Sequence, residues 1–562
     1  MSYDGSIMIS QSLSAIIKKI NLISTLSEEE ILASKRKFAK KFGERLPTNA
    51  ELLAGYRQLL QQKKIKRSLK LEQLLKKRQV RTLSGVAPIA VLTKPYQCPG
   101  QCLYCPSEKN MPKSYLSNEP AVMRADLCDF HPFKQVALSM MALKNNGHDT
   151  DKLELIVMGG TWDYLPPKYR LWYIYACFVA ANRPLIKIIG NQKPEIRNQK
   201  LGRERILIDK KIKLKNINEV NWQDLEREQK KNEKAKHRIV GLTLETRPDY
   251  VSEKSALEAR RFGATRFELG VQSLDDKVLK LNKRGATTAD TIRATKILRD
   301  FGFKITYHLM LNLPGSNPKK DYEMFLGLFK NSNFQPDQIK IYPTVVTRDT
   351  KLYKLWRAKK YRPYSTPELK KLLEKIKKII PYYVMVIRVI RDIPEESIAA
   401  GNKVTNLRDL LKVKCKCIRC REVGHVKKNQ ISNIKNQKYG IPLREMKLYL
   451  EKYKVNGGIE YFLSYESPNR EVLYAFLRLF LKNDKNSIIR ELHTYGQLVP
   501  IASRIKTASQ HQGLGKKLMN EAEKLARNNG DKKISVIAGI GVREYYRKLG
   551  YRLEQTYMVK DL

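Results

Sequence analysis

Acidic residues are scarce in this sequence. Its 562 residues include 56 Asp and Glu against 108 Lys and Arg, which gives a net charge of +52 at pH 7. A genome-wide bias toward lysine would account for part of this excess, since the chain is rich in Lys and Asn throughout. A positive field of this strength still favours a polyanionic partner, above all a nucleic acid.

Long apolar runs are also missing. The longest, residues 171–181, ends at Asn182 and Arg183 and is too short to cross a membrane. The N-terminus carries Asp4 and has no long apolar core, so it does not resemble a signal peptide. An anionic membrane surface is therefore the weaker alternative to a nucleic acid, and we expect a cytoplasmic protein.

Cysteines are few, and six of the eight fall into two tight clusters. Clustered thiols suit metal binding in a reducing compartment better than they suit disulfide bonds. Cys128 and Cys177 are isolated, and we expect them to be ordinary core or surface residues.

The first cluster, Cys98, Cys102 and Cys105, has the spacing C-x3-C-x2-C. Such thiolates hold iron–sulfur clusters, which usually take four ligands, so three would leave one iron open. A β-rich run at 88–92 places them beyond the carboxyl end of a strand, where parallel barrels carry their chemistry. The spacing resembles that of radical S-adenosylmethionine (SAM) enzymes, which implies a 4Fe–4S cluster with SAM on the open iron. A zinc knuckle without its fourth ligand, or three unrelated thiols, is the alternative.

Residues 1–85 are expected to form a basic helical segment. Apolar residues recur there at helical spacing, and Ser27 followed by three Glu is typical of a helix start. Basic pairs on three expected helices would contact phosphates without reading a nucleic-acid sequence, although any single pair is equally explained as a solvated face. The basic residues are Lys35, Arg36, Lys37, Lys40, Lys41, Lys63, Lys64, Lys66, Arg67, Lys76, Lys77, Arg78 and Arg81.

Strand and helix patterns alternate from 86 to 390, which is typical of a parallel α/β fold and predicts a full or partial barrel of six to eight units. The expected strands are 89–93, 153–158, 239–244, 266–270, 305–311, 338–342 and 383–389. The expected helices include 132–143, 168–181, 253–262, 290–301, 322–329 and 367–380. A polar, Lys-rich stretch at 190–237 is expected to be a surface insertion ending in a helix over 222–234.

Small or polar residues follow several of these strands. Each alone is common turn chemistry, but together they would form a ring of contacts around a small polar cofactor. They are Gly159, Gly160, Thr161, Glu245, Thr246, Arg247, Gln272, Ser273, Asn312 and Thr344.

The second cysteine cluster lies in a linker at 391–440. Cys415, Cys417 and Cys420, with His425 five residues later, are close to a Cys3His zinc site, although the first pair is tighter than in common zinc fingers. We favour a structural zinc that fixes the angle between the domains on either side. A redox cluster is the competing interpretation, and bystander thiols are a third.

From 441 to 562 the pattern changes to strands and a glycine-rich turn. Gln510 to Gly515 has the form Q-x-x-G-x-G and opens a helix, whose N–H groups suit a pyrophosphate. A strand at 533–537 and a helix at 543–548 with Tyr545 and Tyr546 follow. This order resembles a GNAT-type acetyltransferase, whose turn binds coenzyme A, and a general nucleotide-binding loop is the alternative. The expected earlier strands are 459–465, 472–481, 489–495 and 499–503.

Longer sequence motifs make the resemblance to a known family more specific. From about residue 80 to 562 the sequence is similar to the catalytic subunit of Elongator, in its archaeal or bacterial single-subunit form. The strings are VMGGT at 157–161, ETRPDY at 245–250, GVQS at 270–273, KIYPT at 340–344, RDIP at 391–394, ELH at 491–493 and GY at 550–551.

The resemblance implies a radical SAM barrel followed by a GNAT-type domain that together modify carbon 5 of the wobble uridine in tRNA. Cys98, Cys102 and Cys105 would hold the 4Fe–4S cluster, and SAM would lie against Gly159, Gly160, Thr161, Glu245 and Gln272. Acetyl-CoA would contact Lys152, Glu491, Leu492, His493, Thr494, Gln510, Gly513, Leu514, Gly515, Tyr545 and Tyr546. The expected catalytic residues are Lys152, Lys340 and Tyr545.

The implied reaction has three parts. Reductive cleavage of SAM yields a 5′-deoxyadenosyl radical, which takes hydrogen from the methyl group of acetyl-CoA. The carbon radical attacks the uridine, and hydrolysis of the thioester leaves a carboxymethyl group. The cluster needs a reductant, and an anticodon loop suits the enzyme because single-stranded bases can be splayed into a pocket.

The rival class is a protein lysine acetyltransferase with a structural cluster. Transfer to an amine needs a general base near the thioester, which Glu491 or a tyrosine could supply. The basic surface argues against it, because lysine-rich substrates would be repelled. A tRNA-binding scaffold without activity is opposed by the presence of every motif, and the sequence leaves a homo-oligomer open.

Overall fold

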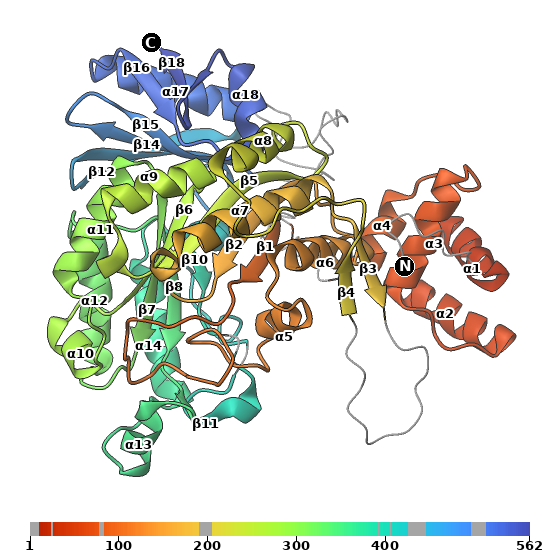
Figure 1. Cartoon of the computed structure of the whole chain (residues 1–562), viewed down its shortest axis with the longest axis horizontal. Helices are drawn as coiled ribbons and strands as arrows, with labels where there is room; N and C mark the ends of the chain where they lie inside the picture. Colours follow the sequence, from red (N-terminus) through yellow and green to blue (C-terminus); the bar gives the residue numbers. More distant parts are fainter. Residues whose placement is uncertain are drawn as a thin grey trace.

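The computed structural model describes residues 10–23, 26–77, 82, 84–189, 205–391, 393–404, 406–424, 445–495 and 513–562. They form an N-terminal helical unit, a central barrel domain and a C-terminal domain (Figure 1). None of the helices in this described part combines the length and apolar character that crossing a membrane requires.

The N-terminal unit has four helices, one more than the sequence analysis expected. They are α1 (Gln11–Asn21), α2 (Glu28–Phe42), α3 (Asn49–Gln61) and α4 (Leu69–Leu75). Ser27 caps α2 with Glu30 in a capping box, which confirms the expected helix start. The unit has its own apolar core and lies beside α6 (Pro132–Asn145), where Arg57 Nη1 donates to the Lys144 carbonyl at 2.7 Å (Figure 1).

The central domain is a parallel sheet in the order β1-β2-β5-β6-β7-β8-β10. The outer strands β1 and β10 are not paired with each other, so the predicted barrel is a partial one. The strands are β1 (Ala87–Leu92), β2 (Lys152–Met158), β5 (Arg238–Thr246), β6 (Arg266–Gln272), β7 (Lys304–Leu311), β8 (Gln338–Pro343) and β10 (Met385–Arg388).

Helices cover the outer face of this sheet (Figure 1). They are α5 (Pro120–Leu127), α6, α7 (Pro167–Asn182), α8 (Trp222–Asn232), α9 (Glu253–Phe262), α10 (Asp276–Leu281), α11 (Thr288–Asp300), α12 (Pro318–Lys330) and α14 (Thr366–Ile379). Helix α13 (Lys351–Arg357) lies away from the sheet and packs on the strand at 346–347 (Figure 1). Helix α9 has the predicted bounds because Ser252 caps its first turn and Gly263, at φ 85°, ends it in the left-handed conformation.

Two short strand pairs form separate sheets outside the main sheet of the barrel. Strand β3 (Ile186–Ile189), just before the Lys-rich insertion, pairs antiparallel with β4 (Arg205–Ile208) inside it, and the sequence analysis did not predict this pair. Near the other edge, β9 (Val346–Thr347) pairs with β11 (Ile398–Ala400), and the short helix α15 (Ile418–Arg421) follows.

The C-terminal domain is a seven-stranded sheet in the order β12-β13-β14-β15-β16-β18-β17, antiparallel except between β15 and β16. The sequence analysis predicted its central strands but missed β12, β17 and β18, and its expected strand at 499–503 lies outside the described residues. The strands are β12 (Lys447–Val455), β13 (Gly458–Glu466), β14 (Leu473–Lys482), β15 (Ile488–Thr494), β16 (Lys533–Val536), β17 (Arg552–Glu554) and β18 (Tyr557–Asp561), and the helices are α17 (Leu514–Asn528) and α18 (Arg543–Arg547).

The C-terminal domain packs against the amino ends of the barrel strands. A Cβ on Gly539 would stand 2.1 Å from the carbonyl oxygen of Val240, near the start of β5. Arg490 of β15 donates to the carbonyl of Phe303, just before β7, and pairs with Asp337, just before β8, both at 2.5 Å. The cluster loop follows β1, so it lies at the opposite, carboxyl end of the barrel.

Candidate active site

The first cysteine cluster occupies the loop between β1 and α5. Cys98, Cys102 and Cys105 are half-buried, and the backbone N–H of Gly100 donates to Cys98 Sγ at 3.4 Å. Arg284 Nη1 lies 3.8 Å from Cys102 Sγ. The loop therefore presents three thiols at the carboxyl edge of the sheet, as predicted.

Positive side chains surround these sulfurs. Arg247 packs so closely on the loop that a Cβ on Gly100 would stand 2.1 Å from its Nη1. Burial raises the pKa of Cys105 to about 11, while Lys113 and Arg391 oppose this shift. Three thiols at this spacing supply the sulfur donors of an iron–sulfur cluster, and the adjacent cations suit its negative charge.

The residues predicted to contact SAM gather near this loop. Gly159 and Gly160 follow β2 with φ of 129° and 109°, and a Cβ on Gly159 would stand 2.1 Å from Thr93 Oγ1 beyond β1. The space beside Gly160 is open, since its Cβ would meet only the Lys113 carbonyl at 3.9 Å. These left-handed conformations explain why glycine stands at both positions.

Two more predicted SAM contacts end neighbouring strands. Glu245 of β5 accepts a hydrogen bond from Tyr115 Oη at 3.0 Å. Gln272 ends β6 at φ 71°, where the pairing with β7 shifts register. Both line a cavity, whereas Thr161 is buried. The structure thus brings the ring of strand-end residues to one edge, and their binding roles stay predictions.

A charged cluster lies in the middle of the barrel interior and lines its cavity. Glu268 of β6 pairs with Lys340 of β8, and His308 Nε2 of β7 lies 3.0 Å from Glu268 Oε2. Although burial opposes ionisation, Lys340 and His308 hold the pKa of the Glu268 carboxyl well below its ordinary value. Burial alone would lower the pKa of Lys340, but Glu268 raises it. The predicted catalytic Lys340 is therefore an ion-paired ammonium inside the barrel.

The β15 residues that the sequence analysis predicts to contact acetyl-CoA lie where the C-terminal sheet opens. Strands β15 and β16 pair only at Ile488 and Ile489, so the four residues from Glu491 to Thr494 lie beyond the paired segment. A gap inside a sheet exposes backbone N–H and C=O groups that need partners. The extended pantetheine arm of coenzyme A suits such a gap.

The glycine turn begins α17 at this gap. Gly513 is the N-cap at φ 75°, and Leu514 is the first helical residue and is buried. No side chain of the described residues caps the first turn, and backbone N–H groups at such a position suit an anion. A Cβ on Gly515 would stand 2.8 Å from Tyr545 Oη. Gln510 lies outside the described residues.

Helix α18 places Tyr545 against this turn. The Tyr545 side chain is 39% exposed, whereas Tyr546 is buried beneath it. The residues on either side, Arg543 and Arg547, pair with Glu233 of the barrel insertion at 3.2 and 2.8 Å. The insertion therefore holds the tyrosine helix in place, a role that the sequence analysis did not predict.

One cavity of about 1160 Å³ joins these parts. It contains Tyr104 and Pro106 of the cluster loop at one end and Gly513, Gly515 and Tyr545 at the other. Lys152, the first residue of β2, also lines it, and burial lowers the pKa of Lys152. The barrel interior is thus a hollow that connects the cluster loop with the C-terminal domain.

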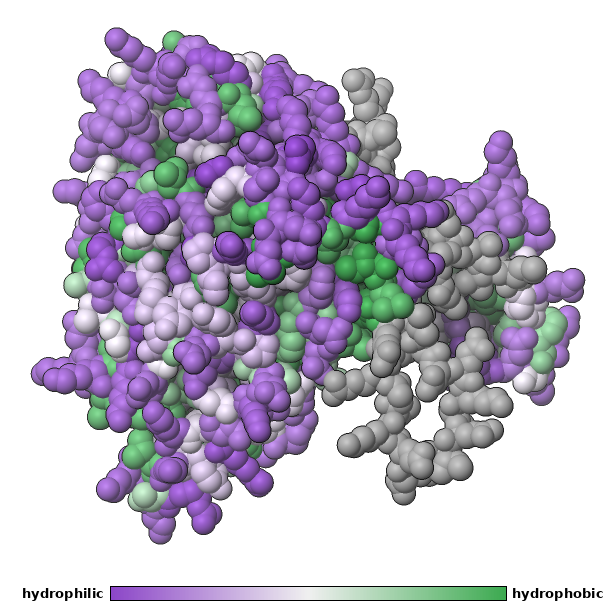
Figure 2. Space-filling view, in the orientation of Figure 1, coloured by the Kyte–Doolittle hydropathy of each residue, from purple (hydrophilic) through white to green (hydrophobic). Residues whose placement is uncertain are grey.

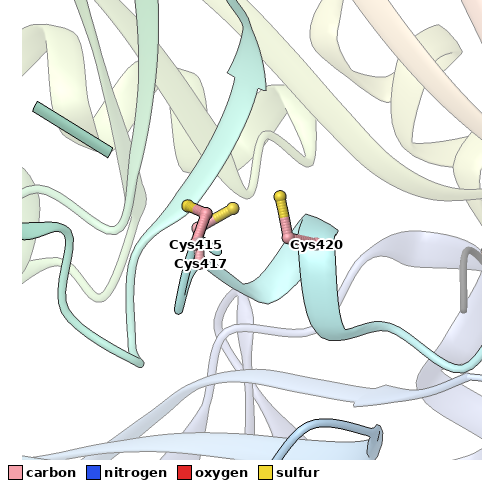
Figure 3. A group of neighbouring side chains, drawn as sticks. All are labelled: Cys415, Cys417 and Cys420. Atoms are coloured by element: carbon pink, nitrogen blue, oxygen red, sulfur yellow. The ribbon is translucent and has the colours of Figure 1, made fainter. Parts of the chain in front are cut away.

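The second cysteine cluster lies between the two domains. Figure 3 shows Cys415, Cys417 and Cys420 side by side, and their sulfurs lie within 4.8 Å of one another. Hydrogen bonds from the other two thiols hold the pKa of Cys417 well below its ordinary value. Ile418 N–H donates to the Val384 carbonyl beside β10, and Val423 N–H to that of Leu473 in β14. His425 lies outside the described residues, so the zinc site stays a prediction.

The basic residues of the N-terminal unit are mostly exposed. Arg36, Lys37 and Lys40 are exposed on α2, and Figure 2 shows hydrophilic side chains on the visible outer part of this unit. Lys76 is different because it is half-buried at the junction with the barrel, where burial lowers its pKa. Arg78 and Arg81 lie outside the described residues.

Comparison with protein families divides the chain in the same way. Residues 215–328 match the Radical SAM superfamily, residues 336–418 match the Radical_SAM C-terminal domain, and residues 503–561 match an acetyltransferase (GNAT) domain.

Whole-length relatives combine both domains. The chain is 39% identical to a tRNA uridine(34) acetyltransferase of Methanocaldococcus jannaschii, over 97% of this chain and 96% of that protein. It is 36% identical to the human Elongator complex protein 3, over 87% and 86%. The solved structure of the archaeal Elp3 of Methanocaldococcus infernus, with an N-terminal deletion, superimposes with a TM-score of 0.67 at 38% identity, over 85% of this chain and 99% of that one.

Proposed function

The chain belongs to the tRNA uridine(34) acetyltransferase family, which includes Elongator complex protein 3, and we propose that it transfers an acetyl-derived carboxymethyl group to carbon 5 of the wobble uridine. The observation that carries this proposal is the cavity shared by the cluster loop and the coenzyme A residues. A reaction that needs both cofactors requires their reactive groups to meet in a space closed to water.

The two ends of the cavity have different tasks. At the carboxyl end, Cys98, Cys102 and Cys105 would hold the 4Fe–4S cluster and the strand-end residues would hold SAM. When bound, these groups supply hydrogen-atom abstraction from the acetyl methyl group. At the amino end, the first turn of α17 and Tyr545 would bind acetyl-CoA, with Lys152 reaching its acyl end from the barrel.

His493 is the residue that would activate water for thioester hydrolysis. Its Nε2 lies 3.0 Å from the carbonyl oxygen of Ser84, which can only accept, so Nε2 carries the proton. Burial lowers the pKa of His493, which favours the neutral ring with an unprotonated Nδ1. A neutral imidazole of this tautomer is a general base, and such a base contributes roughly 10²–10⁴-fold to a rate.

The tRNA would lie across the N-terminal unit. Its exposed lysines and arginines suit phosphates, and the anticodon base would enter the cavity to meet the acetyl group. The three clustered thiols between the domains would hold a structural zinc.

Nucleoside analysis tests the proposal. Anaerobically reconstituted protein is incubated with tRNA, SAM, a reductant and acetyl-CoA labelled in its methyl group. Label in a carboxymethyl group on U34 is expected, and its loss is expected when SAM is omitted. SAM-independent acetylation of lysine peptides, with unmodified tRNA, would instead favour a protein acetyltransferase.

A further inference from the structure

Two functional side chains of β15 are held by the barrel and not by their own domain alone. Lys304, the first residue of β7, places Nζ 3.2 Å from Glu491 Oε1. Ser84, just before β1, accepts from His493 Nε2. Both contacts cross the interface between the domains.

The Lys304–Glu491 pair is shielded from water. The two side chains are 16% and 7% exposed, and both line the cavity. Although burial opposes ionisation, Lys304 and Arg478 together hold the pKa of Glu491 below its ordinary value. Charges in such a site act more strongly than on the surface.

The two cations beside Glu491 are not equivalent. Arg478 Nε lies 3.0 Å from Glu491 Oε2, but its guanidinium also pairs with Asp337 and donates to the carbonyl of Tyr383. Among the described residues, the ion pair with Glu491 is the one that Lys304 makes. Arg478 therefore shares its charge among several partners at the domain interface, whereas Lys304 pairs with Glu491 alone among the described residues.

From these contacts we infer that Lys304 is a positioning residue for thioester cleavage, so that the acetyltransferase site is a composite of both domains. The inference rests on the proposed function of the β15 site. It means that the C-terminal domain has its full site only when it is docked on the barrel.

The charges around His493 predict the direction in which the pKa of His493 changes when Lys304 is replaced. Glu491 on its own strand and Glu154 on β2 raise the pKa of His493, whereas Lys304 on β7 lowers it. Arg478 on β14 acts through Glu491, and the rings of Phe476 and Tyr495 pack on the imidazole. Tyr546 on α18 also faces Glu491. Removing the charge of Lys304 therefore raises the pKa of His493.

The test measures tRNA-dependent release of coenzyme A by the full-length protein between pH 5.5 and 9. The neutral base is protonated as pH falls, so the rate declines on the acid side of the pH–rate profile. This acid limb should move to higher pH in Lys304→Met, and the rate at pH 7 should fall roughly tenfold or more. Lys304→Arg should restore the wild-type profile. Lys296→Met, which removes an exposed lysine of α11, is the matched control and should behave as wild type.

Iron content and SAM cleavage report whether each variant is folded, and Lys304→Gln replaces Lys304→Met should that variant fail to fold. A wild-type rate and acid limb in the neutral variant would overturn the inference. Equal losses in the neutral and Arg variants with an unmoved limb would also overturn it, because they indicate packing. Absence of coenzyme A release from the wild type would instead contradict the proposed function.

Discussion

Lys340 of β8 and Glu268 of β6 form an ion pair inside the barrel, midway between the cluster loop and the C-terminal domain. Most barrels of parallel strands fill this layer with branched apolar side chains. Here the layer is charged and the interior is hollow, and both residues line the cavity between the cluster loop and the C-terminal domain.

Replacing Lys340 by Met should therefore destabilise the protein. Leaving one partner of a buried pair unmatched costs roughly 3–5 kcal/mol. The lowered pKa of Glu268 stabilises the fold above the unfolded carboxyl pKa of about 4.3, and this contribution is lost as pH falls through the folded value. The difference in thermal midpoint between variant and wild type should be largest near pH 7 and narrow below about pH 4.

The control for this experiment is Lys330→Met, which removes an exposed lysine of α12. It should leave the midpoint unchanged at every pH. A constant difference between Lys340→Met and wild type across the pH range would show that Glu268 does not depend on Lys340 for its ionisation.

Cys102 should be essential for iron binding. Cys102→Ser removes one of three thiols from the loop, so reconstituted protein should lose its iron and its charge-transfer absorbance, and it should not cleave SAM when reduced. Cys177→Ala, in the core of α7, should keep all three properties. Unchanged iron and SAM cleavage in Cys102→Ser would remove the radical enzyme interpretation.

The alternating strands and helices of the barrel could be predicted because the hydrophobic periods are regular and the caps are strong, as at Ser252 and Gly263. Strand β12 was missed because it is an edge strand with exposed charges at Lys447, Lys452 and Lys454, which resembles a solvated segment. The positions of the three cysteines and of Gly513 and Gly515 could also be predicted, since each motif is local in the chain.

The contact between Lys304 and Glu491 could not be predicted, because it forms only after two domains dock. No periodicity relates positions 187 residues apart. The sequence held one indirect signal, because Glu268, His308 and Lys340 are polar residues within the barrel strands. The register pairs His308 with Lys340, and the Glu268 side chain contacts both. Inward polar residues at that spacing indicate a hollow barrel.

Gly515→Ala should weaken acetyl-CoA binding. The new Cβ would stand 2.8 Å from Tyr545 Oη, so the tyrosine or the helix start must shift. We expect about a tenfold loss in affinity, equivalent to about 1.4 kcal/mol. The loss should shrink in a Tyr545→Phe background, because the clashing atom is gone. Equal losses of acetyl-CoA affinity in both backgrounds would show that the clash with Tyr545 is not the cause of the weaker binding.

The cluster of Cys415, Cys417 and Cys420 predicts that a bound zinc stabilises the contact between the barrel and the C-terminal domain. Cys417→Ser should lose bound zinc and lower the thermal midpoint, because the loop around α15 joins β10 to β14, yet its iron content should not change. Cys128→Ser, a buried cysteine of the barrel, is the comparison for a simple thiol loss. Purified wild-type protein without zinc would contradict the site.

The N-terminal unit should hold tRNA through its exposed charges. Replacing Arg36, Lys37 and Lys40 with Ala should weaken the binding of all tRNAs about equally, because phosphate contacts carry no sequence information. Each lost contact should make the log–log salt slope shallower by roughly 0.7–0.9. Lys76 is a poor target, since it is half-buried at the junction with the barrel and its loss would disturb packing.

The matched control for the N-terminal variant replaces Lys524, Lys532 and Lys533, which are exposed on the C-terminal domain. It removes the same net charge, so it separates local phosphate contacts from the general attraction of a chain with a charge of +52. Acetyl-CoA affinity should be unchanged in the α2 variant. If both triple variants shift the salt slope equally, the N-terminal unit is not the phosphate-binding surface, and the tRNA must be held by the barrel or by the field of the whole protein.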